Sequence, residues 1–237
     1  MKNLIYIILL FLFFSCEGQN KKESTQDKSN ILHPIKHSTM RTQNNYKNLI
    51  NDKVEYFDIK YFDNHKDEAE NLIYIDKFGA EIKIFGDKES GYFNDTTPKN
   101  SLFTIHKEYN YKGVIRQKWV NFKNGIGAVG IKYEFDDSEK LIKQIDTDKD
   151  FKITPDDIIN YCNKNNIDLH NEYTSISRGV NDIIKKSTWE IEYRGKYDGK
   201  YGASIIIELD GNTGELQKVT CINGKHNDSV EILYKKK

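Results

Sequence analysis

Residues 188–194 read Thr-Trp-Glu-Ile-Glu-Tyr-Arg, so that large apolar and charged side chains alternate from Trp189 onward. A period of two is typical of a strand with one buried and one solvated face. Further strands of this kind are predicted at 173–178, 204–209, 215–222 and 230–234, and Asp-Gly-Asn-Thr-Gly at 210–214 is a turn between two of them. The C-terminal half of the chain is therefore predicted to form an antiparallel sheet.

One helix is predicted directly before these strands. Thr154 is a typical N-cap residue, Pro155 takes the first helical position, and Asp157 completes an acidic form of the capping box. Apolar residues then recur on one helical face until paired asparagines end the pattern at 165–166. The sequence thus predicts a helix that starts at Pro155 and ends near Asn165.

This order of a helix and antiparallel strands resembles the PepSY domain. The resemblance is carried by Trp-Glu-Ile-Glu-Tyr at 189–193 and Ile-Glu-Leu-Asp-Gly-Asn-Thr-Gly-Glu-Leu at 207–216, and it covers about residues 154–220. It implies one helix plus a three- to four-stranded antiparallel sheet, a place in the cell envelope, and binding or inhibition through a sheet surface. It carries over no catalytic residue.

Residues 46–150 alternate short β-branched or aromatic runs with polar turns. Hairpin turns are predicted at 76–79, 109–113 and 136–139, and a further strand run starts at Val54. These units are similar to the hairpins of YD-type and MORN-type repeat proteins, and a plain antiparallel meander has the same pattern. Together the two halves predict an α+β fold, a β-rich antiparallel meander at 46–150 followed by a PepSY-like α+β domain at 151–237.

Three glycines, Gly125, Gly127 and Gly130, lie close together in the first half. A phosphate-binding glycine loop needs a strand before the glycines and a helix N-terminus after them. Lys-Tyr-Glu-Phe at 132–135, a strand pattern, follows instead. The glycines are therefore predicted to form a bulged strand or a loop.

The first residues predict export and a lipid anchor. Lys2 precedes eleven consecutive apolar residues at 4–14. As a helix this run measures about 16 Å, too short for a hydrocarbon core of about 30 Å. The basic start, the apolar run and the cysteine after it resemble bacterial lipoprotein signals, which implies removal of residues 1–15 and lipidation of Cys16. The polar composition from Glu17 to about Asn45, without a sustained apolar period, predicts a tether at 16–45. An ordinary signal peptide with an incidental cysteine is the alternative.

The charge balance argues against one class of partner. The 237 residues include 36 Lys+Arg and 36 Asp+Glu, so no net charge attracts nucleic acid. The predicted partners are the membrane, through the lipid anchor, and an envelope or secreted protein. The predicted location is the bacterial cell envelope.

Residues 146–157 partly match a calcium-binding EF-hand loop. Aspartates fill positions one, three, five and twelve of that loop, namely Asp146, Asp148, Asp150 and Asp157. Phe151 takes the sixth position, where the sharp turn favours glycine, and a strand pattern rather than a helix precedes the loop. The alternative is a solvated acidic linker between the two halves. No cofactor other than calcium is suggested.

Two cysteines remain when Cys16 is set aside. An even pair in an oxidising envelope makes a disulfide between Cys162 and Cys221 a candidate, and two buried free thiols are the alternative. In a PepSY-like layout the helix face and the last strand would bring the two residues together.

No motif for a known enzyme class is present. The sequence has no Gly-x-Ser-x-Gly and no His-Glu-x-x-His. It predicts a lipid-anchored envelope protein with a non-enzymatic protein-binding or inhibitory role. An immunity protein against an envelope-targeted toxin is the first alternative, and an envelope enzyme with a site assembled from distant residues is the second.

Overall fold

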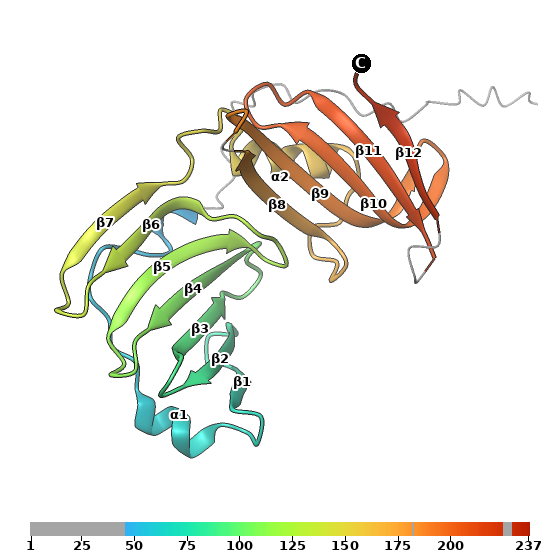
Figure 1. The fold of residues 1–237 in the computed structure, drawn as a ribbon. Coiled ribbons are helices and arrows are strands. Elements are labelled where there is room, and N and C mark those ends of the chain that lie inside the picture. The colour runs from blue at the N-terminus through green and yellow to red at the C-terminus, as the bar shows by residue number, and fades with distance from the viewer. Residues whose placement is uncertain (1–45, 182, 225–228) are drawn as a thin grey trace, which may run out of the picture.

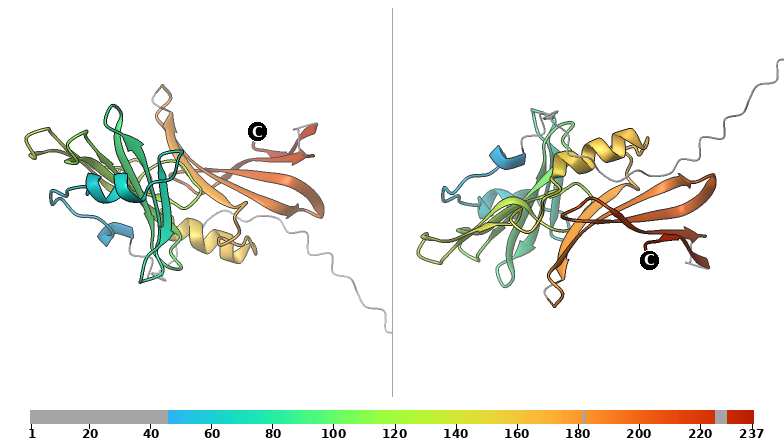
Figure 2. Two further views of the ribbon diagram at one scale, coloured as in Figure 1. Left: turned by 90° about the horizontal axis from the view of Figure 1, so that it is seen from below. Right: turned by 90° about the horizontal axis from the view of Figure 1, so that it is seen from above.

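The computed structural model describes residues 46–181, 183–224 and 229–237. After a short 3-10 helix, η1 (Tyr46–Asn48), these residues form two antiparallel sheets and two α-helices (Figures 1 and 2). The first sheet has seven strands that lie in chain order: β1 (Asn71–Ile75), β2 (Glu81–Asp87), β3 (Gly91–Thr97), β4 (Phe103–Tyr109), β5 (Ile115–Phe122), β6 (Val129–Phe135) and β7 (Leu141–Asp146). The second sheet has five, also in chain order: β8 (Ser175–Asn181), β9 (Lys186–Tyr197), β10 (Lys200–Asp210), β11 (Leu216–Asn223) and β12 (Ser229–Lys235).

The predicted α+β class is wrong, because the described chain is predominantly antiparallel β-structure. The helices are short: α1 (Ile59–His65) has 7 residues and α2 (Pro155–Lys164) has 10. The second half is α2 followed by a five-stranded meander, not a helix with a sheet of three or four strands. One buried cluster contains residues of both sheets and of α2, and a second contains residues of the first sheet and Phe62 of α1, so the two short helices complete the cover of two predominantly β layers.

The helix predicted after Thr154 is confirmed. The Thr154 hydroxyl accepts from the Asp157 N–H at 3.2 Å, and the Asp157 carboxylate accepts from the Thr154 N–H at 2.9 Å. The helix ends at Lys164, with Asn165 as its C-cap. Figure 2 shows α2 lying on one face of the second sheet, beside the first sheet.

The strand predicted from Val54 is wrong. Only Tyr56 makes an isolated bridge, to Val114, and the chain then enters α1. The Asp58 side chain starts this helix by accepting from the Tyr61 N–H at 2.9 Å, which is the N-cap function of aspartate. The helix buries Phe62 completely, in a cluster with apolar side chains of the first sheet.

The predicted hairpins are confirmed. The turns at 76–79, 109–113 and 136–139 join β1 to β2, β4 to β5 and β6 to β7, and the turn at 210–214 joins β10 to β11. The first sheet falls within the predicted region 46–150, and α2 with the second sheet falls within 151–237.

The buried core extends across the boundary between the regions 46–150 and 151–237. One buried cluster contains residues of both sheets and of α2, among them Phe103, Val120, Phe122, Ile158, Cys162, Trp189, Ile191 and Ile207. The largest of these side chains, Trp189, is fully buried. Its ring packs edge to face on Phe122 of β5, with ring centroids 6.0 Å apart.

The glycine segment was predicted as a bulged strand or a loop: Gly125 and Gly127 lie in the loop between β5 and β6, and Gly130 lies in β6, whose register with β5 is irregular. This loop forms the junction between the sheets. The Arg178 N–H of β8 donates to the Ile126 carbonyl at 2.9 Å. A Cβ atom on Gly125 would lie 1.8 Å from the carbonyl oxygen of Ile176, and one on Gly127 would lie 2.2 Å from that of Arg178. The glycines are needed because two backbones approach each other here.

Replacing Gly125 with alanine should lower the free energy of unfolding by about 1–3 kcal/mol, because the loop must move away from β8. Urea unfolding measures this change. Gly179→Ala is the matched control. Gly179 lies on β8, the strand that Gly125 approaches, and a Cβ atom at Gly179 would meet nothing within 4 Å. Equal stability of the two variants would show that the close approach at Gly125 contributes little.

Candidate functional site

The first sheet has a covered face and an open face. Side chains of β2 to β5 that point to one side are buried, among them Ile82, Ile84, Tyr92, Phe103 and Val120. Side chains that point to the other side remain at least partly accessible except that of Thr104, which is buried, and we call this side the open face. Its residues are Ile73, Ile75, Glu81, Lys83, Phe85, Phe93, Asp95, Thr97, Thr104, His106, Glu108, Gln117, Trp119 and Asn121.

A row of five side chains crosses the open face from β1 to β5. Strand register places Ile73, Lys83, Asp95, His106 and Trp119 side by side in this order. His106 Nδ1 lies 2.6 Å from Asp95 Oδ1, and the imidazole stacks on Trp119 with centroids 5.2 Å apart and an interplanar angle of 15°. The carboxylate and the indole together hold the His106 ring in one orientation.

Aromatic side chains also lie on neighbouring strands of this face. The rings of Phe85 and Phe93 stack with centroids 5.1 Å apart, and Phe85 is 40% exposed. Lys132 of β6 places its Nζ 5.6 Å from the centroid of the Trp119 ring. The open face thus combines fixed charges with accessible apolar surface.

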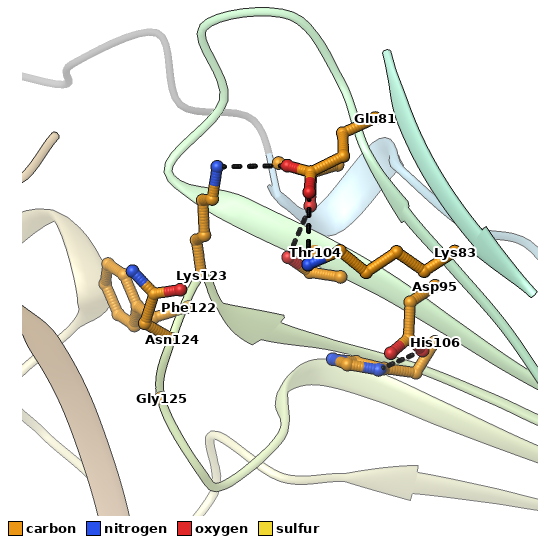
Figure 3. A pocket seen from close by; sticks show the side chains of 10 residues that line it. Glu81, Lys83, Asp95, Thr104, His106, Phe122, Lys123, Asn124 and Gly125 are labelled. Atoms are coloured by element: carbon orange, nitrogen blue, oxygen red, sulfur yellow. Dashed lines mark hydrogen bonds and ion pairs between the residues drawn. The ribbon is translucent and has the colours of Figure 1, made fainter. Parts of the chain in front are cut away.

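A hollow with a volume of about 210 Å³ lies at one end of the open face (Figure 3). The residues that line it are Glu81, Lys83, Asp95, Thr97, Thr104, His106, Phe122, Lys123, Asn124 and Gly125. Glu81 accepts from Lys83 at 3.0 Å and from Lys123 at 3.3 Å. The bond from Lys83 is the main reason that the pKa of Glu81 is below its usual range, so the carboxylate is charged at neutral pH.

The hollow presents polar and charged groups to a ligand. Asp95 occupies Nδ1 of His106, which leaves Nε2 for a ligand. The nearby hydroxyl groups of Thr97 and Thr104 bond to each other at 2.7 Å, and no hydroxyl or thiol of the described residues is hydrogen-bonded to His106.

The predicted calcium ligands do not form a common site. Asp148 accepts from Arg178 at 2.8 Å and from the Gly130 N–H at 3.0 Å, and Asp157 belongs to the capping box. The Asp146 carboxylate accepts from the Asp148 N–H at 2.9 Å, and Asp150 is exposed. Among residues 46–181, 183–224 and 229–237, no group of three or more His, Cys, Asp or Glu side chains could hold a metal ion.

Cys162 and Cys221 are both buried in the common core, and both are free thiols, so no disulfide joins them in the structure. Burial raises the pKa of the Cys162 thiol to about 12. This thiol therefore stays protonated at neutral pH and is a poor nucleophile.

The predicted signal, the tether and Cys16 lie outside the described residues. None of the helices formed by the described residues is long and apolar enough to span a bilayer.

The residues of the open face were not predicted as a site. Asp95 and His106 lie on β3 and β4, and the hairpin between them turns at 98–101. A hairpin folded about this turn places Asp95 opposite His106, so the turn signal of Pro98 and the polar residues after it could have predicted this pair. Trp119 lies beside His106 because of the register between β4 and β5, which must be known separately.

No protein-family model, curated protein or solved structure matches the chain.

Proposed function

We propose that the chain is a lipid-anchored protein of the bacterial cell envelope that binds another protein through the open face of the first sheet. The observation that carries this proposal is the row from Ile73 to Trp119, where fixed charges lie beside accessible apolar side chains. Aromatic residues are enriched at protein interfaces, with polar groups at their rims. The envelope location rests on the N-terminal pattern that ends at Cys16.

Binding accounts for the open face better than catalysis does. The Asp95–His106 pair resembles half of a catalytic arrangement, but within the described chain it lacks a nucleophile in hydrogen-bond contact. The same pair offers a fixed donor or acceptor at His106 Nε2, which suits a polar group of a protein partner. Inhibition of an enzyme and neutralisation of a toxin are two ways in which such binding would act.

A photo-crosslinker should locate this interface. We expect a benzoylphenylalanine in place of Phe85, in the full chain expressed in the bacterial envelope, to give one dominant crosslinked protein after irradiation. Phe85 is 40% exposed and lies beside the row. The crosslinked product, identified by mass spectrometry, is the readout.

Tyr201 is the matched control position, because it is an aromatic residue on β10 of the second sheet and is 58% exposed. A crosslinker there should give no dominant product. The proposal is wrong if both positions give the same products, or if neither gives a product.

A further inference from the structure

The outer edge of β1 has unpaired backbone groups. Both edge groups of Asn71 are bonded to Asp67: the Asn71 N–H donates to the Asp67 carboxylate at 2.8 Å, and the Asn71 carbonyl accepts from the Asp67 N–H at 2.7 Å. Backbone direction alternates along a strand, so the N–H and C=O groups of Ile73 and Ile75 also point outward. In the part of the chain that the structure describes, no second strand pairs with them.

This edge lacks the usual protection. Natural edge strands carry charges, proline or a cover that prevents pairing with another chain. Within the described residues, β1 is Asn-Leu-Ile-Tyr-Ile and has no charged residue. The other edge strands do have charges: Lys143 and Asp146 on β7, Arg178 on β8, and Glu231 and Lys235 on β12. β8 is also bonded to the loop between β5 and β6.

The side chains of this edge belong to the open face. Ile73 and Ile75 are each 64% exposed, and their neighbours across the strand pair are Lys83 and Glu81. A strand added to β1 would lengthen the row of the open face by one residue. Its side chains on that side would contact the two isoleucines, which favours apolar residues there.

The charge around β1 favours a basic partner. Residues 58–83 contain seven acidic residues and four lysines, so a net negative charge remains although Glu70 pairs with Lys66 and Glu81 with Lys83. Glu70 and Asp76 flank the strand at its two ends. Antiparallel pairing of two copies centred on Ile73 would place Glu70 opposite Asp76 of the other copy, and this like-charge contact disfavours a homodimer.

We infer that the partner adds a β-strand to β1, and that this strand has apolar residues flanked by lysine or arginine. The inference rests on the proposed binding function and specifies its mode. Main-chain bonds to Ile73 and Ile75 would supply affinity, and the two isoleucines with their acidic flanks would supply specificity.

The test starts from the purified full chain and a displayed library of random peptides. We expect selection to enrich peptides with alternating apolar residues between basic residues. A synthesised peptide from this selection should slow the hydrogen exchange of the Ile73 and Ile75 amides. These amides should exchange rapidly before the peptide is added, because no strand of the described residues pairs with them.

Ile73→Pro should weaken binding of the peptide by about tenfold, because it removes an outward N–H and leaves the bonds to β2 in place. Ile73→Lys keeps the backbone intact and should also weaken binding, by repelling the basic flanks. Tyr201→Ala should leave peptide binding unchanged, since Tyr201 lies on β10 of the second sheet.

Several results would overturn the inference. The first is slow exchange of the Ile73 and Ile75 amides in the free chain, which would mean that residues 1–45 or a second copy cover the edge. The second is selection of peptides without basic flanks. The third is peptide binding that Ile73→Pro does not weaken. If one of these occurs while the Phe85 crosslink persists, strand addition is wrong and the binding function stands. Loss of that crosslink would instead refute the binding function.

Discussion

Replacing Arg178 with methionine should lower the free energy of unfolding by about 3–5 kcal/mol, because it leaves the Asp148 carboxylate without its buried cation at the junction of the sheets, with only the exposed Lys47 at 3.9 Å. The Arg178 side chain is 2% exposed and donates to Asp148 at 2.8 Å. The same guanidinium donates through Nε to the Ala128 carbonyl at 2.7 Å and lies 4.6 Å from the centroid of the Phe151 ring. One side chain thus holds the loop between β5 and β6, the end of β7, and β8 together.

Arg194→Met is the control for this prediction. Arg194 lies on the neighbouring strand β9, is exposed, and stacks on Tyr173 with its guanidinium carbon 3.8 Å from the ring centroid. Its loss should cost no more than about 1 kcal/mol. If urea unfolding gives similar losses for the two variants, the buried pair does not contribute as the structure indicates.

The same pair should make stability depend on pH. Burial alone would raise the pKa of Asp148, but the Gly130 N–H and the Arg178 guanidinium hold this pKa below its usual range. A carboxylate whose pKa is lower in the folded chain stabilises the fold above its unfolded pKa of about 3.9, and this contribution is lost as the pH falls through the folded pKa.

Wild-type chain should therefore lose more stability than Asp148→Asn when the pH is lowered below about 4. Urea unfolding of both chains over this range measures the difference. A constant difference in stability between them at every pH would contradict the lowered pKa of Asp148.

The Asp148–Arg178 pair also shows why the calcium hypothesis arose. Alternating aspartates in a short loop match calcium ligands, but they equally suit a turn whose carboxylates accept N–H groups and an arginine. Arg178 lies 30 residues away in sequence, so local spacing does not reveal it. The choice between the two interpretations depends on a long-range contact.

The parts of the fold that local chemistry determines were predictable. Thr154, Pro155 and Asp157 specify the start of α2 through neighbouring atoms alone, and the hairpin turns are specified in the same way. The open face depends on the register of five strands, so Asp95 and His106 gave no separate signal. The class was mispredicted because the sequence does not show that the two sheets share one core.

Replacing Trp189 with alanine should lower the free energy of unfolding by about 3–5 kcal/mol, the usual cost of removing a large buried aromatic side chain. Trp189 is fully buried, and its Nε1–H donates to the Ile153 carbonyl at 3.0 Å. Trp189→Phe is the control, because it keeps much of the packing and loses chiefly this bond. Its cost should be smaller, about 1–3 kcal/mol.

The Trp189→Ala chain also tests whether the two halves unfold together. The sequence has two tryptophans, so Trp119 of β5 is then the sole tryptophan and its fluorescence reports on the first sheet. Because one buried cluster contains residues of both sheets, removal of Trp189 from the second sheet should also destabilise the first. We expect the Trp119 fluorescence and the far-ultraviolet circular dichroism to change in a single transition at a lower urea concentration than in wild type. A Trp119 transition at the wild-type midpoint, with a separate earlier loss of circular dichroism, would show instead that residues 46–150 and 151–237 are independent folding units.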